Sequence, residues 1–322
     1  MVTENFRFGI IGCGEIAEHF VQAAQSMAEV GVEAVAARDL DRARDFAGRH
    51  TIQRSYGDYS KMLRESPLDG VYIATVNSTH LDAILLAVEA GIPVLCEKPL
   101  VLSLADFDRV ADAAERRGVA LMEAMWSCFL PSYQAMREII RQGRLGSIVR
   151  ADIHFSVPFP KNPNSRIYSP ALGGGLIYDI GVYNLHTAFT LFGEEFHNLS
   201  ICGRIGSTGV DVGSVISFVY EDGPLVCTTT VDVAGPHELL LCGDHGRLRA
   251  ENYNGSQSLI LTLDGQPEQE IACPFAGNGF EYEIREFISV VRSGRKESGL
   301  LPWSRSRLVC QVMEQAVHAI CN

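Results

Sequence analysis

The sequence lacks the features of a membrane-spanning or exported chain. No apolar run reaches the roughly 18 residues that a membrane helix needs. The polar start from Met1 to Phe8 leads into a strand-like run and lacks the apolar core of a signal peptide. Nine cysteines are scattered singly, without a Cys-x-x-Cys pair, which is typical of reduced thiols. The sequence therefore predicts a cytoplasmic protein with no membrane partner.

Basic side chains are also scarce. Lys and Arg number 27 against 39 Asp and Glu, which gives a formal net charge of −12. An acidic surface disfavours nucleic acid as a partner. The histidines lack ligand spacing and the cysteines do not cluster, so no metal site is expected. No Gly-x-Ser-x-Gly elbow supports a serine nucleophile.

The composition is otherwise that of a globular chain, with 47% hydrophobic and 20% charged residues, and the length of 322 residues suggests two domains. Up to residue 125, short apolar strands alternate with helical patterns. Strands are expected at 7–11, 32–37, 71–74, 94–96 and 119–122, and helices at about 16–27, 41–50, 81–90 and 104–117. This alternation predicts an α/β domain of Rossmann type over residues 1–125, with a doubly wound parallel sheet.

The second half has a different pattern. Strand-like runs follow one another at 149–157, 213–220, 225–233, 238–242, 247–250 and 259–263, and helices are expected at about 175–192, 280–292 and 304–320. Residues 126–322 are therefore predicted to form an α+β domain with a large, mostly antiparallel open sheet, and its last helices can pack back on the first domain. Because three helices leave one sheet face uncovered, we expect a homodimer or a dimer of dimers.

The first strand runs into Gly12-Cys13-Gly14-Glu15-Ile16-Ala17, a G-x-G-x-x-A pattern between a strand and a helix. Gly12 permits the tight turn, Gly14 lets backbone approach a pyrophosphate, and Ala17 lets the helix pack closely. The helix N-terminus offers free N–H groups to the phosphates. A glycine turn without a ligand is the alternative. The strand–turn–helix context favours a dinucleotide site formed by these six residues.

The end of the second strand bears on which dinucleotide binds. An NAD site usually has an acid here for the ribose 2′-hydroxyl, but Ala37 cannot fill that role. Arg38 and Arg42 follow at i and i+4, and guanidinium groups suit a 2′-phosphate. Asp39 can serve as the NAD acid or pair with Arg42. The residues favour NADP, with NAD as the alternative.

Asp179 and Tyr183 are four residues apart on a predicted helix and so share one face, with His186 three residues further on. Oxidation of an alcohol needs a hydride acceptor and a base for the hydroxyl proton. A tyrosine has an ordinary pKa near 10, too high for a good base at neutral pH. Taken alone, the spacing also fits a structural aspartate and a half-buried core tyrosine.

Several motifs follow one another along the chain and carry a wider resemblance. They are Thr75-Val76-Asn77-Ser78-Thr79-His80, Glu97-Lys98-Pro99, Gly173-Gly174-Gly175-Leu176-Ile177-Tyr178-Asp179-Ile180-Gly181-Val182-Tyr183 and Gly279-Phe280-Glu281-Tyr282-Glu283. In this order they resemble the glucose-fructose oxidoreductase/inositol dehydrogenase/MocA family of nicotinamide oxidoreductases over nearly the whole chain. The segments 36–40, 95–99 and 121–126 are most similar to the dimeric dihydrodiol dehydrogenases, an NADP-dependent subgroup.

This resemblance implies roles for individual residues. It places Lys98 near the nicotinamide and the reacting oxygen, where its charge would lower the pKa of Tyr183. Many members have a histidine at that position, whereas the subgroup has a tyrosine. Asp179 would orient the lysine or bind a substrate hydroxyl. The subgroup tends to have an arginine where this chain has Cys128, which puts any contact of that arginine in doubt.

Further site residues rank lower. The resemblance adds Thr75, Asn77, His80, Glu97 and Lys98 to the cofactor site, although His80 can equally cap the following helix and Glu97 can be a structural partner. The substrate pocket is expected to include Trp126, Phe155, Phe280 and His186, with core packing as the alternative. The predicted function is NADP-dependent hydride transfer to or from a sugar, cyclic diol or related polyol. A dinucleotide-binding sensor of the same fold without catalysis is the alternative.

Overall fold

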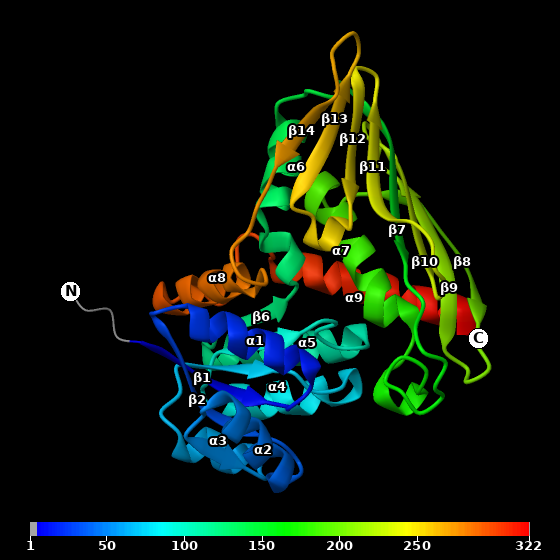
Figure 1. The fold of residues 1–322 in the computed structure, drawn as a ribbon. Coiled ribbons are helices and arrows are strands. Elements are labelled where there is room, and N and C mark those ends of the chain that lie inside the picture. Colours follow the sequence, from blue (N-terminus) through cyan, green and yellow to red (C-terminus); the bar gives the residue numbers. More distant parts are fainter. Residues whose placement is uncertain (1–4, 322) are drawn as a thin grey trace. The chain divides into compact units, whose positions relative to one another are not determined.

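The computed structural model describes residues 5–321, so residues 1–4 of the polar N-terminal stretch and residue 322 lie outside it. The chain forms two compact units. Unit 1 comprises Met1–Trp126 and Ala276–Arg307, and unit 2 comprises Ser127–Phe275 and Leu308–Asn322 (Figure 1). Unit 1 is therefore built from two segments that lie far apart in the sequence.

Unit 1 contains a parallel sheet of six strands in the order β3-β2-β1-β4-β5-β6. The strands are β1 (Phe6–Ile11), β2 (Val30–Ala36), β3 (Arg54–Tyr56), β4 (Gly70–Ile73), β5 (Val94–Glu97) and β6 (Leu121–Ala124). Strands β4, β5 and β6 are buried at every position, as expected for a sheet with helices on both faces. The predicted Rossmann sheet is confirmed; the three-residue strand β3 was not predicted.

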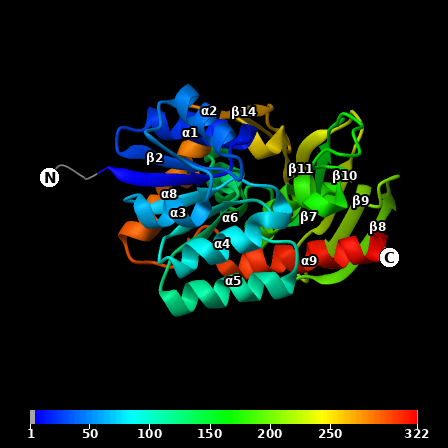
Figure 2. The ribbon, with the colours of Figure 1, turned by 90° about the horizontal axis from the view of Figure 1, so that it is seen from below.

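The helices of unit 1 include one contributed by its second segment. They are α1 (Glu15–Ser26), α2 (Leu40–His50), α3 (Tyr59–Glu65), α4 (His80–Glu89), α5 (Leu104–Arg117) and α8 (Phe280–Arg292). Local signals fix α5 at its predicted bounds: Ser103 Oγ accepts the N–H of Asp106 at 3.2 Å, and Gly118 ends the helix with φ +65°. Figure 2 shows α4 and α5 side by side.

Aromatic side chains fill the face of this sheet that α1 and α8 cover. The Phe20 ring of α1 stacks on Tyr72 at 3.8 Å between centroids and meets Phe8 edge-on at 5.1 Å. Phe287 of α8 lies 5.7 Å from Phe8 and 6.1 Å from Phe6. The two chain segments of unit 1 therefore share one core.

Unit 2 contains an eight-stranded sheet in the order β14-β13-β12-β11-β7-β10-β9-β8. The strands are β7 (Ile148–Ser156), β8 (His197–Ile205), β9 (Asp211–Val219), β10 (Leu225–Val231), β11 (His237–Gly243), β12 (Gly246–Glu251), β13 (Ser258–Leu263) and β14 (Gln269–Ala272). All neighbours pair antiparallel except β7 and β10, which run parallel, so the sheet is mostly antiparallel as predicted. Strands β8 and β14 were not predicted, because their side chains are mostly exposed.

The two faces of this sheet differ. Alternate residues such as Leu239 and Leu241 are fully buried, whereas Leu240 between them is half-buried on the other face. The buried, inner face carries α7 (Val182–Phe192), and α6 (Pro131–Arg141) packs on α7. The outer-face residues of β11, β12 and β13 are half-buried or exposed. The long helix α9 (Trp303–Cys321) begins in unit 1 and continues into unit 2.

The helix expected from residue 175 onward begins later and with a different geometry. Residues Ile177–Gly181 form a π-helical turn that leads directly into α7. Asp211 of β9 accepts the N–H of Ile177 at 2.9 Å, which satisfies one of the donors at the start of this turn. Gly175 has φ +123°, and a side chain there would meet Asp211 Oδ1 at 2.4 Å. The π-helical turn is thus fixed by β9 and by a glycine.

Candidate active site

In unit 1, three loops meet at one edge of the sheet. The neighbouring strands β1, β4 and β5 end at Ile11, Ile73 and Glu97, and the predicted cofactor residues follow each end directly. Because the strands are parallel, these loops share the carboxyl edge, where ligands bind in open α/β sheets. The structure therefore brings the glycine loop, the Thr75 segment and Lys98 together.

The glycine loop has the shape that a dinucleotide needs. Gly12 has φ +107°, and a Cβ atom there would lie 2.3 Å from Ala74 O, so only glycine fits. A Cβ atom on Gly14 would meet nothing within 4 Å, so the space beside this backbone is open. Gly14 precedes the first turn of α1, and Ala17 is fully buried where the helix packs. These features fit a pyrophosphate on the helix N-terminus.

Three residues of the loop differ in exposure and chemistry. Glu15 is exposed, whereas Cys13 and Ile16 are half-buried. Burial raises the pKa of the Cys13 thiol to about 11, while the Arg42 and Arg49 guanidinium groups act in the opposite direction. Cys13 is therefore a protonated thiol at neutral pH.

Asp39 has a structural task at the end of β2. Its Oδ1 caps α2 by accepting the N–H of Asp41 at 2.9 Å and that of Arg42 at 3.4 Å. Arg38 and Arg42 are exposed, and neither guanidinium forms an ion pair among residues 5–321. The charge of Arg42 acts on Cys13, and the charges of Arg38 and Arg42 both act on the Tyr59 hydroxyl. The charge of Arg42 therefore reaches the glycine loop, and that of Arg38 reaches the neighbouring Tyr59.

Lys98 lies in a turn that buried groups hold in place. Glu97 Oε1 accepts the Tyr72 hydroxyl at 2.5 Å, and Glu97 Oε2 accepts the N–H of Lys98 at 3.2 Å. Burial, followed by the charge of Glu97, raises the pKa of Tyr72 well above its usual range, so this hydroxyl stays protonated. Glu97 thus holds the Lys98 backbone in place, while the Lys98 residue is half-buried.

His80 connects this turn to the Thr75 segment. Its ring is fully buried, with Nδ1 at 2.8 Å from Pro99 O and Nε2 at 3.2 Å from Thr75 O. Burial lowers the pKa of the ring, and the backbone carbonyls oppose this shift. Because both ring nitrogens face backbone, the geometry favours a positioning role for His80 over direct cofactor contact. Thr75 and Asn77 remain half-exposed at the sheet edge.

The predicted pocket residues fall into two groups. In unit 1, Trp126 stacks on Phe280, with 5.7 Å between centroids and 19° between planes. In unit 2, Phe155 lies 5.7 Å from the Tyr183 ring and stacks on His237 at 3.9 Å. His237 was not predicted, because a lone histidine after a proline carries no local signal.

His186 is fully buried within α7. Its side chain has no exposed area, and every residue of α7 from Val182 to Leu191 is buried. A helix that is buried all round has no polar face, so the three-residue spacing from Tyr183 could not show which side His186 occupies. His186 is thus an interior residue of α7, and its pocket role stays a prediction.

Asp179 has a partner that sequence reasoning missed. The Arg166 guanidinium donates from Nη1 to Asp179 Oδ1 at 2.5 Å. Asp179 is buried on the π-helical turn, and Tyr183 follows in the first turn of α7. Asp211, which caps the same turn, has its pKa raised to about 6 by burial, and backbone N–H groups oppose the shift.

Cys128 occupies the position where an arginine was expected from the resemblance. It is buried, and its Sγ lies 3.6 Å from Thr190 Oγ1 of α7. This site is a packed interior position that suits a small thiol. No group of three His, Cys, Asp or Glu side chains among the described residues could hold a metal ion, and none of the described helices meets the length and hydropathy needed to cross a membrane.

Comparison with known proteins decides the family. Residues 6–125 match the model of the oxidoreductase family with an NAD-binding Rossmann fold, and residues 133–249 match the GFO/IDH/MocA C-terminal domain. The chain belongs to the Gfo/Idh/MocA family. The predicted resemblance is confirmed, and so is the assignment to nicotinamide-dependent oxidoreductases.

The similarity to individual relatives covers nearly the whole chain. The chain is 32% identical to a Mus musculus protein named trans-1,2-dihydrobenzene-1,2-diol dehydrogenase, over 98% of this chain and 96% of the other. It is 26% identical, with a TM-score of 0.89, to KijD10, a 3-ketoreductase from Actinomadura kijaniata solved with NADP and TDP-benzene, over 98% of both chains. Levoglucosan dehydrogenase, solved with NADH, shares the fold at 18% identity and a TM-score of 0.88, over 98% of this chain and 96% of the other.

Proposed function

We propose that this protein is an NADP-dependent oxidoreductase that transfers hydride between nicotinamide and a CH–OH or C=O carbon of a cyclic diol, sugar or related small polyol. The observation that carries the proposal is the carboxyl edge of unit 1, where the open glycine loop follows β1 and Lys98 follows β5, with only β4 between the two strands. The names of its relatives support the substrate class, because they include a dihydrodiol dehydrogenase and a ketoreductase acting with NADP.

When bound, the nicotinamide supplies the hydride donor or acceptor. The chain handles the proton. In this proposal Tyr183 passes it to or from the substrate oxygen, and Lys98 provides the positive charge that stabilises the phenolate and an alkoxide-like oxygen. Asp179 binds a further substrate hydroxyl. Glu97 and His80 keep the Lys98 turn in place through the buried contacts described above.

The catalytic assignment is tested by two substitutions in the full-length protein. Tyr183→Phe removes only the hydroxyl, so folding and NADP binding should persist while kcat falls by roughly 10²–10⁴-fold. Lys98→Met should lower kcat by at least the same factor. It should also raise the pH at which the remaining activity peaks, because the tyrosine loses its cationic neighbour. The measurement is nicotinamide absorbance at 340 nm over a panel of diols, sugars and ketones. Near-normal turnover by Tyr183→Phe would transfer the proton role to another group.

The preference for NADP rests on the end of β2. Asp39 caps α2 through its Oδ1, and the guanidinium groups of Arg38 and Arg42 on either side of it in sequence are exposed. We expect Arg42→Ala to weaken NADP binding by about tenfold or more, the worth of one charge-assisted hydrogen bond, and to leave NAD binding nearly unchanged. Arg44→Ala is the matched control, because Arg44 is exposed on the same helix but pairs with Asp41. Calorimetric titration that finds tighter NAD binding by the wild type would contradict the preference.

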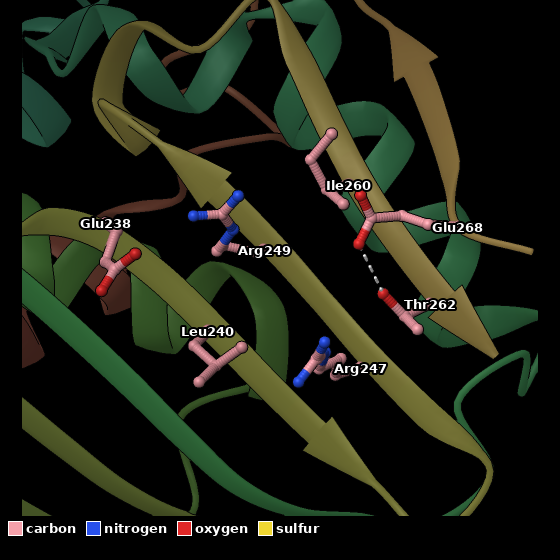
Figure 3. A pocket seen from close by; sticks show the side chains of 7 residues that line it. All are labelled: Glu238, Leu240, Arg247, Arg249, Ile260, Thr262 and Glu268. Atoms are coloured by element: carbon pink, nitrogen blue, oxygen red, sulfur yellow. Dashed lines mark hydrogen bonds between the residues drawn. The ribbon is translucent and has the colours of Figure 1, made fainter. Parts of the chain in front are cut away.

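We further propose that the protein assembles as a homodimer or a dimer of dimers through the outer face of its eight-stranded sheet. Half-buried apolar residues such as Val215, Leu240 and Ile260 lie on this face. A hollow of about 370 Å³ opens there, lined by Glu238, Leu240, Arg247, Arg249, Ile260, Thr262 and Glu268 (Figure 3). Side chains of both charge signs on one face suit a twofold interface, where each patch meets its own copy. Nine free cysteines suit a reducing compartment such as the cytoplasm.

A further inference from the structure

The irregular segment from residue 157 to 175 joins β7 to the π-helical turn that carries Asp179, and it folds on itself. The N–H of Ser165 donates to Asn162 O at 3.0 Å, and that of Ser169 donates to Ser165 O at 3.0 Å. These turns lie wholly within unit 2. The segment is therefore a folded connection with a defined geometry.

The triple glycine fastens this connection to the start of the helix. A Cβ atom on Gly174 would lie 2.7 Å from Ile167 O, 2.8 Å from Ser169 O and 2.9 Å from Arg166 O. The N–H of Gly175 donates to Ile167 O at 2.9 Å, and that of Gly174 donates to Ser169 O at 3.0 Å. Only a residue without a side chain allows this approach, so Gly174 sets where the backbone of Arg166 lies.

Fastened in this way, Arg166 reaches Asp179. Its Nη1 donates to Asp179 Oδ1 at 2.5 Å, and the side chains are 54% and 7% exposed, respectively. A buried carboxylate without a partner is costly, and a guanidinium hydrogen bond offsets that cost while fixing the carboxylate rotamer. The half-exposed guanidinium of Arg166 thus fixes the rotamer of the buried Asp179, which precedes Tyr183 by one helical turn.

A second ion pair in the same segment, Lys161–Asp232, does not involve the π-helical turn. Buried Asp232 accepts Lys161 Nζ, the Tyr168 hydroxyl and the N–H of Phe159. The Lys161 side chain is 67% exposed, compared with 54% for Arg166, and its carboxylate partner follows β10, far from the π-helical turn in sequence. Lys161 is therefore a matched control for Arg166.

We propose that Arg166 is a positioning residue for hydride transfer: it holds Asp179 in the rotamer that binds a hydroxyl next to the reacting carbon. The substrate class that follows is a compound with two neighbouring oxygens, one at Tyr183 and the other at Asp179. This inference rests on the proposed function, in which Asp179 and Tyr183 contact substrate.

The test compares Arg166→Ala and Lys161→Ala in the full-length protein. With a substrate accepted by the wild type, Arg166→Ala should lower kcat/KM by about 10²-fold, as a displaced polar contact does, with unchanged NADP binding. Lys161→Ala should lower kcat/KM less than about threefold, because Asp232 keeps its hydrogen bonds from Tyr168 and Phe159 and has no proposed contact with substrate. Arg166→Lys and added ethylguanidinium should each restore part of the lost activity.

A double-mutant cycle separates positioning from general damage. In an Asp179→Asn background, Arg166→Ala should lower kcat/KM by less than about threefold, because both changes disable the same contact. The second comparison uses a substrate analogue that lacks the hydroxyl next to the reacting carbon. With this analogue, Arg166→Ala should lower kcat/KM much less than with the full substrate. Additive losses, equal losses for both compounds, or an equal loss in Lys161→Ala would overturn the proposal.

A crystal structure of Arg166→Ala provides a readout independent of turnover. We expect the Asp179 side chain to leave its rotamer, whereas an unchanged Asp179 would contradict the proposal. If the wild type transfers no hydride to any compound of the panel, the proposed function fails, and the rotamer of Asp179 still decides the role of Arg166.

Discussion

Glu283 has no exposed surface, and neither of its carboxyl oxygens has a hydrogen-bond partner among the described residues. Burial raises its pKa well above the usual range, and the charge of Glu97 adds to the shift. A carboxyl that is easier to protonate in the folded state lowers the free energy of unfolding as pH rises from its unfolded pKa towards its folded pKa. Glu283 is therefore a source of instability at alkaline pH.

Replacing Glu283 should make the protein more stable. We expect Glu283→Met to raise the free energy of unfolding at pH 8 by about 1–3 kcal/mol, because a buried group without a partner is removed. The gain should shrink at pH 5, where the wild-type carboxyl is protonated. Urea unfolding at both pH values measures the effect, and Glu195→Met, at an exposed site, serves as the control. Parallel pH profiles for wild type and Glu283→Met would refute the interpretation.

At the same scale, motif residues were easier to predict than their partners. The glycine loop and Lys98 lie in short local motifs, so the sequence alone predicts them as site residues. The Arg166–Asp179 pair spans 13 positions through an irregular segment, and no periodicity connects its members. The spacing could not assign His186 to one face, because α7 is buried on all sides.

Two glycines, Gly48 and Gly174, differ in the space around their Cβ positions. Gly48 lies exposed within α2 with nothing within 4 Å of a Cβ position, whereas Gly174 has three carbonyl oxygens there. We expect Gly48→Ala to stabilise the protein by about 0.5–1 kcal/mol through helix propensity. Gly174→Ala should destabilise it by about 1–3 kcal/mol, because the backbone contacts must separate.

Thermal unfolding and kcat/KM of the two glycine variants measure this contrast. Gly174→Ala should also lower kcat/KM, since the segment that carries Arg166 shifts, while Gly48→Ala should leave it unchanged. If Gly174→Ala matched the wild type in both measurements, the triple glycine would not fasten the 157–175 connection.

Elements with strong local signals were predicted at their observed bounds. Helix α8 begins and ends where its pattern placed it, and α5 does so because of a serine cap and a terminal glycine. Strands β8 and β14 escaped prediction because most of their side chains are exposed and give no alternation. Helix α6 was also not predicted, and the π-helical turn has no sequence signature of its own.

At the scale of the whole molecule, the uncovered sheet face predicts self-association. Light scattering at micromolar concentration should give about twice the 35.2 kDa chain mass or a multiple of that dimer. Leu240→Asp and Val215→Asp each place a charge on the apolar part of this face, so we expect both to shift the protein towards monomer with the fold intact. Glu195→Lys, on an exposed loop, is the control. A monomeric wild type would contradict the proposed assembly.

The two-segment construction of unit 1 has a consequence for how the protein is made. Phe6 and Phe8 emerge first during synthesis, but Phe287, which packs against them, follows only after Ser127–Phe275 has been translated. At about 5–20 residues per second, translation of Ser127–Phe275 alone lasts roughly 7–30 s. For that time the nascent chain carries an aromatic sheet face that α8 has not yet covered, a surface suited to a chaperone.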